Sequence, residues 1–152
     1  MPNYKTHLIG GLCTYALLVT LLLSKKPDFH MLIEWLAFCL IGSLFPDIDI
    51  KSKIQIWSYT VLMPILIMLT MLQEYRIAAC AGILACLPLI VNHRGLFHQV
   101  WFISALAGTS VLTCSVYAPR YVCAIGHDVL FFAAGALSHI WLDVGLKKMI
   151  RI

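Results

Sequence analysis

Six apolar runs, separated by short polar segments, constrain the fold of this chain more than any other feature. A helix needs about 20 apolar residues, and at least about 17, to cross the hydrocarbon core of a bilayer. Hydrophobic residues make up 61% of the 152 and charged residues 12%, so polar side chains cannot cover the surface. We therefore predict an all-α integral membrane helical bundle, a single domain over residues 1–152, with about six and at least four transmembrane or membrane-embedded helices. The expected helices are Leu8–Leu23, Met31–Phe45, Ile54–Leu72, Ile77–Val91, Val100–Tyr117 and Val122–Leu146.

Two of these runs, Met31–Phe45 and Ile77–Val91, are short for a complete crossing. Runs of about 15 residues also form buried or re-entrant helices. The other four are long enough to span, although Pro64 should kink the third helix. Pro46 should end the second one, because it lacks an amide hydrogen and disfavours helix at the residue before it.

The net charge of +4 does not indicate a nucleic-acid surface. The Lys and Arg residues are scattered in ones and twos between apolar runs and form no basic face. They are typical of loops and of side chains that anchor helices to lipid headgroups. The sequence thus predicts membrane lipids as partners and no nucleic acid, and it is silent on oligomeric state.

Four polar islands interrupt this apolar chain, and each holds groups that are costly in a membrane unless they have partners or a function. If all six helices cross, the loops alternate sides and the four islands fall on one face. We therefore expect them to form one metal site. The islands contain His7; Asp47 and Asp49; His93, Arg94 and His98; and His139 and Asp143. Other polar residues, namely Asp28, His30, Glu34, His127 and Asp128, fall toward the opposite face and are interpreted as interfacial or helix-end residues.

Each island also has a simpler interpretation. Asp47 and Asp49, two residues apart, could share an ion or could cap the next helix. His139 and Asp143 are four residues apart on one helical face, which suits a shared metal or a plain His–Asp hydrogen bond. His7 alone would be unremarkable.

The pair His93 and His98 needs a break in the helix to act together. Five residues on a continuous helix leave the side chains about 140° apart, which is poor for one ion. A turn at Gly95 would let the two rings converge. The simpler interpretation is two histidines at the membrane interface.

The candidate ligands are nitrogen and oxygen donors without a thiolate. Such a set suits Zn²⁺ and also Mn²⁺ or Fe²⁺. It holds more groups than one tetrahedral ion uses, so we expect one to three ions, with a two-metal cluster among the possibilities.

The motifs resemble the YdjM-like family, described as LexA-regulated, metal-dependent hydrolases of the inner membrane and distantly similar to zinc-dependent phospholipase C and single-strand zinc nucleases. The resemblance covers nearly the whole chain. It departs from the family pattern at Ile50, where a histidine is usual, and at Phe97-His98-Gln99, where Thr-His-Ser is usual. The matching motifs are His7, Gly42-Ser43-Leu44-Phe45-Pro46-Asp47-Ile48-Asp49, His93-Arg94-Gly95-Leu96-Phe97-His98 and Ser138-His139-Ile140-Trp141-Leu142-Asp143.

The resemblance implies a membrane-embedded, phospholipase-like hydrolase in which a metal-activated water cleaves a phosphoester of a phospholipid or related substrate. Asp47 or Asp49 would orient or deprotonate that water, whose pKa a bound metal lowers toward about 7. Arg94 would clamp a phosphate oxygen. The implied metal ligands, with zinc the favoured ion, are His7, Asp47, Asp49, His93, His98, His139 and Asp143.

Two other functions fit the same residues. A divalent-cation or proton transporter would use the cluster as a relay, but it needs polar groups near the bilayer midplane. A structural metal site would clip the helices together without turnover. The positive-inside rule favours a cytoplasmic site in the inner membrane by seven Lys and Arg against four, although the count is even without Lys51, Lys53 and Arg94.

Overall fold

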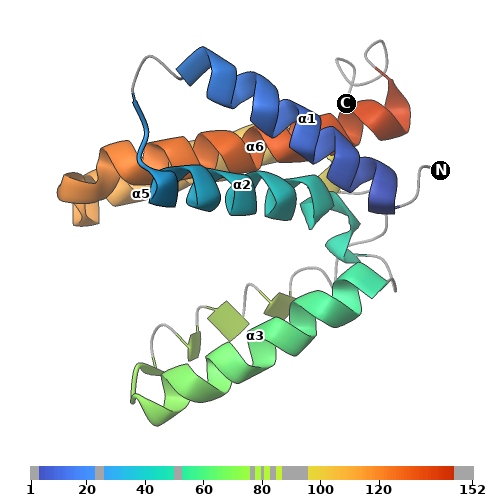
Figure 1. Ribbon diagram of the computed structural model, residues 1–152. Coiled ribbons are helices and arrows are strands. Elements are labelled where there is room, and N and C mark those ends of the chain that lie inside the picture. Colours follow the sequence, from blue (N-terminus) through green and yellow to red (C-terminus); the bar gives the residue numbers. More distant parts are fainter. Residues whose placement is uncertain are drawn as a thin grey trace. The chain divides into compact units, whose positions relative to one another are not determined.

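The protein is all-helical, as predicted (Figure 1). The structure is a computed structural model that describes residues 4–22, 26–49, 53–75, 78–79, 81–82, 85–86 and 96–145. The chain forms two compact units, one from Met1–Pro46 with His98–Ile152 and one from Asp47–Phe97. Because compactness does not establish independent folding, the single domain over 1–152 stays a prediction.

Four helices build the first unit: α1 (Tyr4–Leu22), α2 (Phe29–Leu44), α5 (Val100–Tyr117) and α6 (Val122–Val144). Helices α1, α2 and α6 pack against one another, and α5 packs against α6. Figure 1 shows that α1 and α5 run opposite to α2 and α6. The starts of α1 and α5 therefore lie at the same end of the unit as the ends of α2 and α6, and we call this end the histidine end.

All four helices of the first unit are long and apolar enough to cross a membrane. The bounds of α5 coincide with the expected ones, and α2 ends just before Pro46, where the chain continues as the 3-10 helix η2 (Phe45–Asp49). The short second run is thus among the candidate spans, once η2 extends it to Ile48.

The second unit contains α3 (Lys53–Met71), with Pro64 inside it as expected. The apolar part of α3, Gln55–Met71, is shorter than the four candidate membrane spans. Most of the expected helix Ile77–Val91 lies outside the described residues, and the described ones, 78–79, 81–82 and 85–86, are helical. A bundle with at least four membrane helices is confirmed. The count of six stays a prediction.

Two apolar clusters fill the first unit. Trp35 and Cys39 of α2 pack with Phe131 of α6, and the Trp35 and Phe131 rings stack with centroids 4.9 Å apart. Ile103 of α5 packs with Ala136 and Ile140 of α6 nearer the histidine end. The first cluster joins α2 to α6 and the second joins α5 to α6, so α6 is the helix that both clusters share.

Glycines let α2 and α6 approach closely. A Cβ atom on Gly42 would lie 2.1 Å from the carbonyl oxygen of Phe132, and one on Gly135 would lie 2.1 Å from that of Cys39. Small residues at such crossings let backbones touch where lipid offers no hydrophobic drive for helices to associate. This contact brings the last turn of α2 onto the part of α6 that carries His139.

Candidate metal centre

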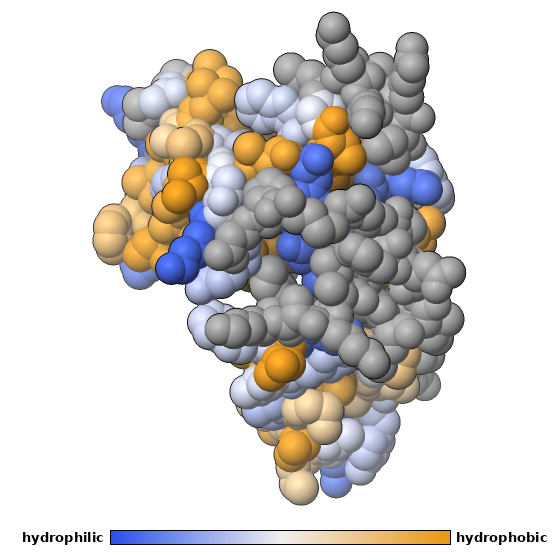
Figure 2. Space-filling model, turned by 90° about the vertical axis from the view of Figure 1, so that its right-hand side faces the viewer, coloured by the Kyte–Doolittle hydropathy of each residue, from blue (hydrophilic) through white to orange (hydrophobic). Residues whose placement is uncertain are grey.

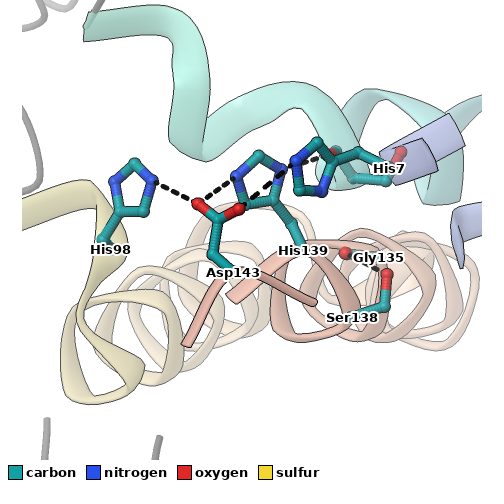
Figure 3. A network of polar contacts seen from close by, with 7 residues as sticks. His7, His98, Gly135, Ser138, His139 and Asp143 are labelled. Atoms are coloured by element: carbon teal, nitrogen blue, oxygen red, sulfur yellow. Dashed lines mark hydrogen bonds and ion pairs between the residues drawn. The ribbon is translucent and has the colours of Figure 1, made fainter. Parts of the chain in front are cut away.

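Four buried or largely buried polar side chains meet at the histidine end (Figure 3). Helix α1 begins at Tyr4, earlier than the expected start at Leu8. His7 therefore lies within the first turns of α1. His98 closes the 3-10 turn η3 (Leu96–His98) just before α5. His139 and Asp143 lie one turn apart on α6, which ends at Val144 and is followed by Gly145 with φ of +74°. Glycine adopts this left-handed conformation without strain, so the helix stops one residue after Asp143.

The carboxylate of Asp143 is the centre of the cluster. Its Oδ1 lies 3.5 Å from Nε2 of His7, while its Oδ2 lies 3.7 Å from Nε2 of His98 and 3.6 Å from Nε2 of His139. These distances exceed those of ordinary hydrogen bonds, about 2.7–3.2 Å. The three imidazoles thus surround one carboxylate without closing onto it.

The tautomer of His139 follows from its other ring nitrogen. Nδ1 lies 2.7 Å from the carbonyl oxygen of Ser43, which can only accept a hydrogen bond. Nδ1 therefore carries the hydrogen, and Nε2 of the neutral ring presents its lone pair toward Asp143. A carbonyl partner of this kind fixes the ring orientation and raises the basicity of a metal-binding histidine.

Ring contacts with His139 hold His7 and His98 in place. His7 lies parallel to His139 with ring centroids 3.7 Å apart, and His98 meets His139 edge-on at 5.5 Å. His139 is fully buried, so its lone pair and the carboxylate oxygens face each other with little water between them. Two acceptors in this arrangement repel, and a cation between them removes the repulsion.

The spacing of the donors fits a metal ion. Two ligands at about 2.0–2.1 Å from a tetrahedral ion lie about 3.3 Å apart, close to the separations around Asp143. Within this unit, one donor atom each from His98, His139 and Asp143 lies within 4.8 Å of the others. Asp47 directly follows Pro46 in the chain and belongs to the second unit. This His/Asp group could hold a metal ion, since imidazole and carboxylate suit zinc as well as manganese or iron.

Within the first unit, the structure brings together four of the seven side chains expected as ligands: His7, His98, His139 and Asp143. Asp47 belongs to the second unit. Asp49 ends η2, and its side chain is not described. His93 and Arg94 lie outside the described residues. The metal-binding role of all seven stays a prediction, as do the catalytic roles of Asp47, Asp49 and Arg94.

The sequence did not identify two contributors to the site. The carbonyl of Ser43 positions His139, and Gly11 of α1 lets Ser43 approach, since a Cβ there would lie 2.8 Å from the Ser43 hydroxyl oxygen. A backbone carbonyl leaves no residue-type signal. Gly11, four residues after His7 and so on the same face of α1, was the available hint.

Figure 2 faces the histidine end and shows hydrophilic residues lying among hydrophobic ones there. At the other end of the unit, Asp28 precedes α2 as its N-cap residue, as a helix-end residue should. Asp128 differs from the expectation. Its place on the α6 face toward α2 leaves it only 6% exposed, so it is a buried residue rather than an interfacial one.

The chain was compared with known families and proteins. Residues 1–151 match the family model described as YdjM inner membrane protein. No curated protein and no solved structure shows a significant similarity to the chain.

Proposed function

Because this chain belongs to the YdjM inner membrane protein family, we propose that it is a membrane-embedded, metal-dependent hydrolase that cleaves a phosphoester of a phospholipid or a related amphiphile. One observation carries the proposal. Three imidazole Nε2 atoms surround the Asp143 carboxylate at 3.5–3.7 Å. One of them, on His139, is oriented as a lone-pair donor by the Ser43 carbonyl.

In this proposal His7, His98, His139 and Asp143 hold the ion, with zinc favoured by the mixed imidazole and carboxylate set. A bound divalent ion would polarise the phosphoester oxygen and make water more acidic. Asp47, by its resemblance to the family motif, would accept the proton of the attacking water. Arg94, by its resemblance to the family motif, would bind a phosphate oxygen through its planar guanidinium.

The position of the site near a membrane interface supports a lipid substrate. Exposed aromatic residues lie near the cluster: Tyr4 in the turn before His7, Trp101 just after His98, and Trp141 beside Asp143. Exposed Tyr117 lies at the opposite end of α5, about 24 Å from Trp101 at about 1.5 Å per residue. Tyr and Trp gather at both membrane interfaces, and the hydrocarbon between these interfaces is about 30 Å thick. A site level with one of these aromatic groups would meet the phosphates of lipid headgroups directly.

The membrane of this family is the inner membrane by name. Within it we propose that the site faces the cytoplasm, because Lys and Arg are more numerous on the side of the four islands. Fusing a reporter that is active only in the cytoplasm after Leu22 or after Tyr117, opposite the site, tests this directly. Activity at either position would place the histidine end outside the cytoplasm.

Cation transport is the second candidate, and one observation favours it. Asp128 is a buried ionisable residue in the other half of the bundle, as a path through the membrane would require. Transport predicts metal-dependent ion flux in liposomes, which a hydrolase does not.

Metal analysis of the detergent-purified protein, paired with a phospholipid-hydrolysis assay, tests the proposal. We expect stoichiometric metal and turnover in the unchanged protein and loss of both in His98→Ala, while Asp47→Ala should lose turnover more than metal. His30→Ala, which removes an exposed imidazole from α2, is the matched control and should change neither. Stoichiometric metal without turnover on any phosphoester would reduce the cluster to a structural clip.

A further inference from the structure

Asp128 is an ionisable group that the proposed hydrolysis does not use. Asp128 is the seventh residue of α6, and it is only 6% exposed. Its Oδ1 atom is inaccessible to solvent and receives no hydrogen bond. An ionisable side chain inside a membrane bundle is expensive, and it usually marks an ion path or a binding site.

The titratable groups within electrostatic reach of Asp128 are Glu34 of α2 and His127 of α6. Glu34 is exposed, so its carboxylate reaches the surface of the unit. From α1, the side chain packed nearest this region with a polar group is Tyr15, and its hydroxyl already donates to the carbonyl of Leu32. No Lys or Arg forms an ion pair with Asp128 in the described part of the chain, so these two acidic groups interact without a compensating protein cation.

His127 is fixed beside this pair. Its Nδ1 lies 2.7 Å from the carbonyl oxygen of Cys123, so Nδ1 carries the hydrogen and Nε2 of the neutral ring carries a lone pair. Its ring lies against Trp35, with centroids 5.2 Å apart. The Ser43 carbonyl orients His139 in the same way at the histidine end. The difference is that the Cys123 carbonyl belongs to the same helix as His127.

The two acidic positions on α6 belong to different sites. Asp128 and Asp143 are 15 residues apart on one α-helix, which separates them by about 22 Å along its axis. No side chain spans that distance, so Asp128 cannot contribute to the cluster around Asp143.

We propose that Asp128 and Glu34 form a second site that binds a hard divalent cation, Mg²⁺ or Mn²⁺, from the membrane face opposite the histidine end. Magnesium sites commonly use one or two carboxylates and keep several waters, and Mn²⁺ also favours oxygen ligands. A divalent cation neutralises both carboxylates and supplies the contact that Oδ1 of Asp128 lacks. The exposed side chain of Glu34 gives the ion its route of entry.

Mn²⁺ binding to the detergent-purified full chain, measured by electron paramagnetic resonance, tests the second site. Asp143→Asn disables the histidine end, so any remaining Mn²⁺ site lies elsewhere. We expect one Mn²⁺ site in Asp143→Asn and a loss of affinity of about 10-fold or more when Asp128→Asn is added, as for groups that ligate or support a metal. Adding Asp28→Asn instead, an exposed carboxylate at the start of α2, should leave this affinity unchanged.

Glu34→Gln in the same background keeps the test decisive if Asp128→Asn does not fold, because Glu34 is exposed and its replacement does not disturb the core. It should also weaken Mn²⁺ binding by about 10-fold or more. Unchanged binding in the folded variants, or no Mn²⁺ site in Asp143→Asn, would overturn the proposal. The hydrolysis assay is not involved, so a failure here leaves the proposed function standing, and the reverse is also true.

Discussion

The two ends of the four-helix unit use the same kinds of residue in opposite ways. At the histidine end, three helices and a 3-10 turn supply polar groups, and three imidazoles converge on the carboxylate of Asp143. At the other end, Asp128 is buried to a similar extent and accepts no hydrogen bond at Oδ1. The Asp143 carboxylate at the histidine end therefore has many polar neighbours, and the Asp128 carboxylate at the other end has few.

Helix position explains this difference. Helix ends and the turn η3 meet at the histidine end, so residues distant in sequence can each contribute a side chain or a carbonyl. Asp128 lies inside a helix, where backbone groups are already paired within the helix. Only side chains of its own helix and of adjacent helices can reach it, and among the described residues Glu34 and His127 are the titratable groups that do.

The strongest test of the histidine end is Asp143→Asn. This change keeps the shape but removes the charge on which three imidazoles converge. We expect metal affinity to fall by at least about 100-fold, beyond the loss typical of supporting residues, and turnover to fall with it. Metal content per chain and phospholipid hydrolysis measure the two effects, and Asp28→Asn serves as the control. A variant that kept its zinc would show that Asp143 is not a ligand.

The close contact of α2 with α6 is tested by Gly135→Ala. The new Cβ would lie 2.1 Å from the Cys39 carbonyl oxygen and 2.9 Å from the Ser43 nitrogen, so backbone must move. Overpacking of this kind costs about 1–3 kcal/mol or more, measured by thermal unfolding in detergent.

Gly126→Ala on the same helix is the matched control for that substitution, because no atom lies within 4 Å of its added Cβ. Alanine is favoured over glycine inside a helix by up to about 1 kcal/mol, so this variant should be equally or more stable. Equal destabilisation of the two variants would show that the α2–α6 contact is not the tight one described.

Gly11→Ala separates positioning from ligation. The added Cβ would lie 2.8 Å from the Ser43 hydroxyl oxygen and 2.9 Å from its Cβ, and Ser43 also holds His139 through its carbonyl. We expect metal affinity to fall by about 10- to 100-fold, as for groups that orient a ligand. In the neighbouring Gly10→Ala the closest atom, 2.6 Å away, is the flexible end of Leu142, so metal titration should show a smaller loss. The same loss in both variants would remove the role assigned to Ser43.

The smallest effect is expected for Trp141→Phe. Trp141 is exposed beside Asp143, so its replacement should change the free energy of unfolding by no more than about 0.5 kcal/mol and leave metal content intact. The substitution removes the Trp141 emission. In the unchanged protein, this emission should be quenched most strongly by quenchers located at headgroup depth. Loss of a component quenched from the bilayer centre would place the histidine end too deep for headgroup chemistry.

Much of the fold is readable from the sequence because lipid leaves few choices. Apolar runs of sufficient length must pair their backbone groups internally, so they form helices, and Pro46 marks the end of one. The grouping of His7, His98, His139 and Asp143 was also predictable. Alternating crossings bring their three segments to one face, and polar groups in an apolar chain gain from meeting.

The sequence by itself therefore indicated four of the membrane helices, the end of α2 before Pro46 and which of the described polar residues share an end of the bundle, since these depend on composition and on chain direction. The tertiary structure decided that the Ser43 carbonyl orients His139, that Gly11, Gly42 and Gly135 set how closely the helices approach, and that Asp128 is buried. Those properties depend on how each helix is rotated about its axis. Rotation is set by contacts between residues far apart in the chain, which no local pattern records.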